Sequence, residues 1–195
     1  MKLHYKGKYD MNPESLPCLP HLPGAVMFKE PTDSKKLAII ANAISFVIMA
    51  LLAVPVIIRS KDYLPDSYWQ LLAGCFVPFL LIFPHELLHA ICFKKDVYLY
   101  TNFKQGMAFV VGPETMSKGR FVFLSLLPNL VFGVLPYILG LIFPKLVFLS
   151  VLGVLCTGMG AGDYFNVFNA LTQMPKNART YMHKFNSYWY IPENK

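Results

Sequence analysis

Long runs of apolar residues separated by short polar segments dominate this chain. Four runs are long enough to cross a bilayer core of about 30 Å, which takes about 20 helical residues. They cover residues 37–58, 69–93, 120–142 and 145–171. The pattern therefore predicts an all-α membrane domain of four transmembrane helices over residues 37–171. A polar N-terminal tail (1–36) and a polar C-terminal tail (172–195) flank it.

The segment between the second and third apolar runs, residues 94–119, differs from the other connections. Its stretches VYLYTNF and GMAFVV are rich in β-branched and aromatic residues, and a Lys-Gln-Gly turn separates them. This composition predicts a short β-hairpin, with an irregular loop at the membrane surface as the alternative. The exposed edge of the VYLYTNF strand could hold an extended peptide as an added strand.

Composition and charge agree with a membrane protein. Hydrophobic residues make up 55% of the chain and charged residues 15%, against about 25% charged in soluble domains. The net charge is +7, but no Lys/Arg-rich block or nucleic-acid motif accompanies it, so we expect lipid and not nucleic acid as a partner. If both termini are cytoplasmic, 15 of the 18 Lys and Arg residues fall inside. This bias predicts a multi-pass cell-membrane protein with cytoplasmic termini and a cytoplasmic hairpin.

Ionisable residues interrupt the second apolar run. His85, Glu86 and His89 form the motif HELLH, in which two histidines four residues apart share one helix face. Imidazole nitrogens at this spacing can bind one zinc ion, and the glutamate can accept a proton from a zinc-bound water. Charged groups cost at least about 2.5 kcal/mol each within a membrane helix, so they are rarely incidental. The alternative is a histidine pair that hydrogen-bonds between helices, with Glu86 near the headgroups.

A catalytic zinc ion takes three protein ligands and leaves one position for water, so a third ligand is needed. Asp163 is the only acidic residue between Lys145 and Glu193. His85 and Asp163 each lie eight residues before the cytoplasmic end of their runs. At 1.5 Å per residue, both are about 12 Å below that end. The shared depth favours Asp163 as the third ligand, and the alternative is that it caps or pairs within its own helix.

Small and polar residues occur at the same depth. Gly158 and Gly162 form a GxxxG face, which lets helices approach closely or serves packing alone. Asn166 is one turn after Asp163 and is a candidate to support that ligand. Asn129, in the third run, could donate to a substrate or an oxyanion. A hydrogen bond between helices is an equal alternative for Asn129.

The chain resembles a family of bacterial membrane proteins named putative zincin peptidases, which are similar in plan to site-2 proteases. The resemblance covers about residues 70–190 and rests on the HELLH run, the hairpin segment, the PN and GD pairs and the final SYWY. It implies zinc as cofactor and hydrolysis of a membrane-protein or peptide substrate within or beside the bilayer. The site-2 protease pattern implies His85, His89 and Asp163 as zinc ligands and Glu86 as the general base.

The chain departs from the site-2 protease pattern around its aspartate. Those proteases usually carry Asn-Pro before the aspartate and glycine after it, whereas Gly162 precedes Asp163 here and Tyr164 follows. The difference concerns substrate-admitting elements more than metal ligands. The alternative function is a membrane zinc-binding or partner-holding protein that does not hydrolyse peptides. Glu86 argues against this alternative, because zinc binding does not require it.

Overall fold

The computed structural model describes residues 1–31, 34–184 and 186–193. The chain forms two compact units. The first comprises Met1–Glu30, Glu86–Ser125 and Asn166–Lys195, and the second comprises Pro31–His85 and Leu126–Phe165. Helix α2 (Tyr68–Ile91) is continuous from the second unit into the first.

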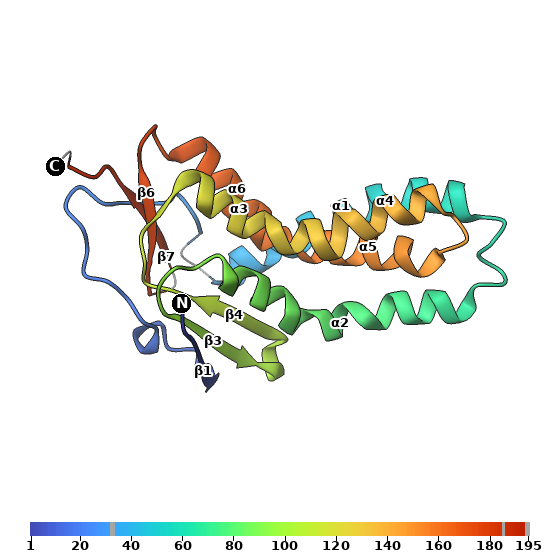
Figure 1. The fold of residues 1–195 in the computed structure, drawn as a ribbon, viewed down its shortest axis with the longest axis horizontal. Coiled ribbons are helices and arrows are strands. Elements are labelled where there is room, and N and C mark those ends of the chain that lie inside the picture. The colour runs from blue at the N-terminus through green and yellow to red at the C-terminus, as the bar shows by residue number, and fades with distance from the viewer. Residues whose placement is uncertain (32–33, 185, 194–195) are drawn as a thin grey trace. The chain divides into compact units, whose positions relative to one another are not determined.

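The first unit contains two β-sheets (Figure 1). One has the order β1-β3-β4, made of β1 (Leu3–Lys8), β3 (Val97–Asn102) and β4 (Met107–Val111). Strand β1 is parallel to β3 and β4 is antiparallel to it, so β3 is the central strand. The other has the order β2-β7-β6-β5, made of β2 (Val26–Met27), β7 (Asn186–Tyr190), β6 (Arg179–His183) and β5 (Met116–Ser117). Short 3-10 turns lie at Pro13–Ser15 (η1) and Phe103–Gln105 (η2).

These sheets show that the predicted all-α fold is wrong, because the described chain mixes helices with sheets. The hairpin itself is confirmed as β3 and β4, joined by η2 and by Gly106, whose φ of +62° is left-handed. Of the strands that were not predicted, β1, β2, β6 and β7 come from the polar terminal segments, and β5 follows the hairpin. Leu3 pairs with Val97, and Val26 pairs with Trp189. Pairing over such sequence separations leaves no local periodicity.

The core of the first unit fixes the end of α2 against the start of α3 (Lys118–Pro128) and the end of α6 (Ala161–Gln173). Its buried apolar side chains are Phe28, Ala90, Phe93, Val97, Met116, Phe121, Leu124, Ala170, Met174 and Ala178. Phe121 and Leu124 are three residues apart and share one face of α3. The last turn of α2 is therefore held by apolar packing close to the HELLH motif.

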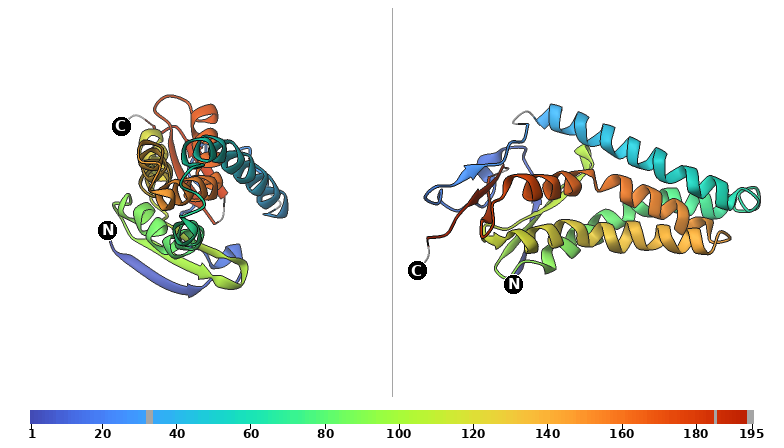
Figure 2. Two further views of the ribbon diagram at one scale, coloured as in Figure 1. Left: turned by 90° about the vertical axis from the view of Figure 1, so that its right-hand side faces the viewer. Right: turned by 90° about the horizontal axis from the view of Figure 1, so that it is seen from above.

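The second unit is helical. Helices α1 (Ser34–Ser60), α4 (Leu135–Ile142) and α5 (Val147–Met159) lie side by side (Figure 2), and a π-helical turn, η3 (Asn129–Val134), joins α3 to α4. Gly133 lies against Thr157 and Gly140 against Ser150, where an added Cβ would come within 3 Å of a backbone nitrogen. Small residues thus allow close helix contact, as in membrane bundles.

Three helices within the described residues are long and apolar enough to cross a membrane, namely Ala38–Ser60, Tyr68–Ile91 and Lys118–Ile142. They match the first three predicted runs to within about two residues at each end. The fourth run forms two helices, α5 and α6, bent by 52° at the break between them. If this bent pair is one broken span, the number of candidate spans rises to four.

Candidate metal centre

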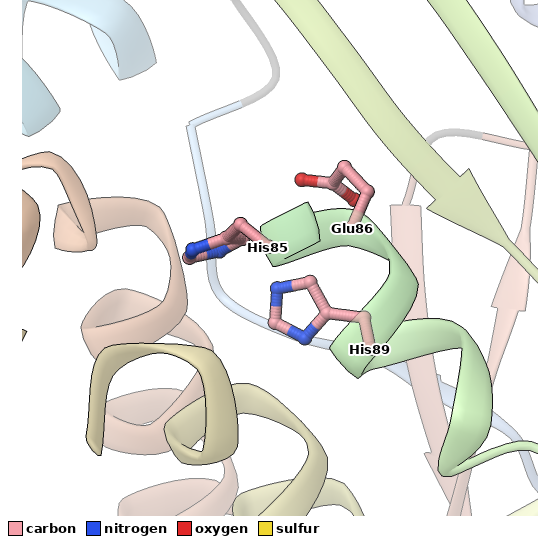
Figure 3. A group of neighbouring side chains, drawn as sticks. All are labelled: His85, Glu86 and His89. Carbon is pink, nitrogen blue, oxygen red and sulfur yellow. The ribbon is translucent and has the colours of Figure 1, made fainter. Parts of the chain in front are cut away.

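The last turns of α2 bring His85, Glu86 and His89 together. Their candidate ligand atoms all lie within 4.8 Å of one another. Figure 3 shows the two imidazole rings next to each other, with the Glu86 carboxylate beside them. Elsewhere in the described part of the chain, no group of three His, Cys, Asp or Glu side chains gathers this closely. The helical spacing of the motif therefore produces the cluster that the sequence predicts.

The ring of His89 is held by the backbone of α3. Its Nδ1 lies 2.9 Å from the carbonyl oxygen of Leu124, and its side chain is buried. A carbonyl oxygen only accepts, so Nδ1 carries the proton and Nε2 presents a lone pair. Metal-binding histidines almost always donate their second ring nitrogen in this way, which fixes the tautomer and orients the ring.

His85 is joined to Asp163 across two helices of the second unit. His85 Nε2 lies 3.1 Å from Asp163 Oδ2. Two ligands at about 2.0–2.2 Å from a tetrahedral zinc ion lie roughly 3.3–3.6 Å apart, which is close to this separation. The separation is compatible with both atoms binding one zinc ion. The residues present fit zinc, and the assignment of His85, His89 and Asp163 as its ligands stays a prediction.

Asn129 supports Asp163. Its Nδ2 donates to Asp163 Oδ2 at 2.7 Å, and the side chain is 2% exposed. Of the two roles that the sequence left open, the structure shows the hydrogen bond between helices. Asn129 follows Pro128 and begins the π-helical turn η3, a kind of turn that occurs frequently at functional sites. Asn166 is half-buried one turn after Asp163 on α6, and its supporting role stays a prediction.

Glu86 faces the edge of the first sheet. It is buried, and its Oε2 accepts a hydrogen bond from the backbone N–H of Val110 in β4 at 3.0 Å. Neither this contact nor the one between His89 and the Leu124 carbonyl was predicted from the sequence. Pro128 is a signal for the second contact, because it lies four residues after Leu124 and has no N–H to bond the Leu124 carbonyl within the helix. The Val110 N–H has no such signal in the sequence.

Gly160 is the glycine that makes room for the Asn129–Asp163 contact. A Cβ atom at Gly160 would lie 1.7 Å from Asn129 Oδ1. Gly158 packs instead against Met49 of α1, and Gly162 faces nothing within 4 Å. The predicted close helix approach occurs at Gly158, against α1, and not at Gly162, while Gly160 lies at the break between α5 and α6. The break also places Asp163 in the first turn of α6, where the helix dipole favours a carboxylate.

The substitution Gly160→Ala is expected to weaken zinc binding by about 10–100-fold, the usual effect of disturbing a ligand's supporting residue. The new methyl group would displace the Asn129 amide and remove its bond to Asp163. Gly162→Ala is the matched control, since its Cβ enters open space. Zinc affinity measured by chelator competition checks both variants, and equal affinities in the two would contradict this role of Gly160.

An HExxH helix with converging side chains and an oriented histidine defines the class of zinc metallopeptidases. The family described as putative zincin peptidase matches residues 78–179, slightly more than half of the chain, and the chain belongs to this family. The matched residues include the HELLH motif, the hairpin, Asn129 and Asp163. No curated protein and no solved structure matches the chain.

Proposed function

We propose that this protein is a membrane-embedded zinc metallopeptidase, similar to site-2 proteases, that hydrolyses peptide bonds within or near the bilayer. The observation that carries the proposal is the HELLH cluster, in which the Leu124 carbonyl orients His89 for metal binding. Family membership supports the same chemistry. Loss of peptide hydrolysis in Glu86→Gln, with zinc retained, is the test of this function.

We assign metal binding and proton transfer to different residues of the candidate site. His85, His89 and Asp163 would hold the zinc, which when bound lowers the pKa of water to about 7 and polarises a carbonyl group. Glu86 would accept the proton of the attacking water and pass it to the leaving amine. The Val110 N–H holds one carboxylate oxygen of Glu86, which keeps the base oriented before substrate arrives.

The bilayer is the proposed environment because helices α1 and α2 expose large apolar side chains. Among them are Phe46, Leu51, Phe76, Phe79 and Leu80, each at least 60% exposed. Such extensive apolar exposure suits contact with lipid chains. The distribution of Lys and Arg supports a cell-membrane protein whose two termini face the cytoplasm.

This orientation predicts which loops can be labelled. In a variant without native cysteines, Asp66→Cys between α1 and α2 should react with a membrane-impermeant maleimide added to intact cells. Lys104→Cys in the hairpin should react only after the cells are opened. Both side chains are exposed, so burial does not limit either reaction. External labelling of residue 104 would reverse the proposed orientation.

The proposed substrate-binding element is the outer edge of β4. The sequence predicts this edge on the VYLYTNF strand, but that strand is β3, which pairs with β1 on one side and β4 on the other. Val110 donates to Glu86, so its N–H points away from β3. Antiparallel strands alternate in this respect, and the N–H of Ala108 points the same way. An extended substrate paired with this edge would lie beside the general base.

The substitution Ala108→Pro is expected to lower the kcat/KM of cleavage about 2–10-fold. It removes one outward backbone donor, and a hydrogen bond contributes about 0.5–1.5 kcal/mol. The ladder between β3 and β4 would stay, because the Ala108 N–H does not belong to it. Leu3→Pro, at the opposite edge of the same sheet, should cleave as the wild type does. Equal kcat/KM for Ala108→Pro and the wild type would place substrate elsewhere.

A further inference from the structure

An ion pair between buried Glu114 and half-buried Arg120 holds the backbone immediately after the HELLH motif. Glu114 is 4% exposed, and its Oε1 lies 2.5 Å from Nη2 of Arg120. Arg120 donates from Nε and Nη2 to the carbonyl oxygen of Cys92, at 2.9 and 2.6 Å. Glu114 Oε2 accepts from the backbone N–H groups of Lys94 and Lys95, at 2.8 and 2.5 Å. The segment that follows α2 is thus held at a carbonyl group by Arg120 and at two N–H groups by Glu114.

The pair provides hydrogen-bond partners for backbone groups at the end of α2. The last carbonyl groups of a helix have no partner within the helix, and a cation is favourable beside them. Arg120 supplies the cation at the end of α2, and Glu114 balances its charge. Removal of Arg120 would leave the charge of Glu114 buried without its counterion, which is strongly unfavourable. The two residues therefore act as one unit.

The same face of α3 contacts α2 at the candidate metal centre. Arg120 and Leu124 are four residues apart on α3, so they lie on one side of that helix. Leu124 supplies the carbonyl that orients His89, while Arg120 grips the carbonyl of Cys92. The Arg120 contact thus joins α3 to the end of α2 one turn before the Leu124 carbonyl that meets Nδ1 of His89.

We propose that Arg120 and Glu114 are positioning residues for the zinc site. They hold α3 in the register that keeps Nε2 of His89 aimed at the metal, although neither residue is a ligand. This inference rests on the proposed function, because it assigns His89 to zinc. It goes further by making zinc affinity depend on the Arg120–Glu114 ion pair, which lies outside the HELLH motif.

The test compares zinc affinity in detergent-purified full-length variants. Arg120→Ala is expected to bind Zn²⁺ about tenfold more weakly, at the low end of the effect of supporting residues. Its Co²⁺-substituted form should show an altered visible absorption spectrum, because His89 would tilt. Lys118→Ala is the matched control. Lys118 lies in the same turn of α3, but it donates to the carbonyls of Leu171 and Met174 at the end of α6.

The conservative variant Arg120→Lys keeps the test decisive if Arg120→Ala does not fold. Lysine preserves the charge but lacks the planar group that donates two bonds, so zinc affinity should fall by less than in the alanine variant. Wild-type affinity and spectrum in a folded Arg120 variant would overturn the inference, and so would an equal loss in Lys118→Ala. Failure of the wild-type protein to bind zinc would overturn the proposed function together with the inference.

Discussion

Replacing Glu86 by glutamine is expected to reduce peptide hydrolysis by about 10²–10⁴-fold, the usual contribution of general acid–base catalysis. Glutamine cannot accept the proton of the attacking water. Its side-chain oxygen can still accept the hydrogen bond that Val110 donates to Glu86 at 3.0 Å. The variant should therefore fold and bind zinc while losing the chemical step.

Two measurements check the Glu86 prediction. Uncleaved substrates should accumulate in the membrane proteome of cells that carry Glu86→Gln, compared with cells that carry the wild type. The zinc content of the two purified proteins should be equal. Asp66→Asn is the control, because it makes the same carboxylate-to-amide change at an exposed loop. An unchanged proteome would favour the non-hydrolytic zinc-binding or partner-holding alternative.

Alanine at His85, His89 or Asp163 is expected to abolish zinc binding under conditions in which the wild type keeps its zinc. Each change removes a ligand, so the loss should exceed the 10–100-fold effect typical of supporting residues. His183→Ala is the control, since the His183 ring contacts the carbonyl of Leu19 outside the cluster. Metal content after purification and chelator competition measure the effect.

Asp163 is the decisive member of this series. It is joined to the motif through His85, at 3.1 Å, and to Asn129, at 2.7 Å. Full zinc retention in Asp163→Ala would assign the third ligand to another residue and would leave Asp163 as a hydrogen-bond partner of His85. The same result in His89→Ala would contradict the orientation argument from Leu124.

The sequence predicted the features that depend on local pattern. The apolar runs located three long helices, because hydropathy is set residue by residue. The hairpin was predictable because β-forming residues flank Lys104-Gln105-Gly106 and the turn is short. The cluster of His85, Glu86 and His89 followed from helical spacing alone.

The features that escaped prediction depend on contacts between distant residues. Strand β1 carries three lysines in its neighbourhood and no strong apolar alternation, so only its pairing with β3 makes it a strand. The break at Gly160 lies inside an apolar run, and hydropathy gives no sign of a bend there. Pro128 leaves the Leu124 carbonyl without its helical partner, but the sequence does not show that His89 is the group that takes it. The role of the Val110 N–H escaped prediction because every residue except proline carries the same backbone donor.

The zinc content of the detergent-purified wild-type protein tests the central claim most directly. The candidate ligand atoms of His85, Glu86 and His89 lie within 4.8 Å of one another, and Asp163 lies 3.1 Å from His85. Elemental analysis after reconstitution with Zn²⁺ and removal of excess metal should give about one zinc ion per chain, as one HExxH site would bind. A protein that is folded, yet retains no zinc under these conditions, would contradict the account.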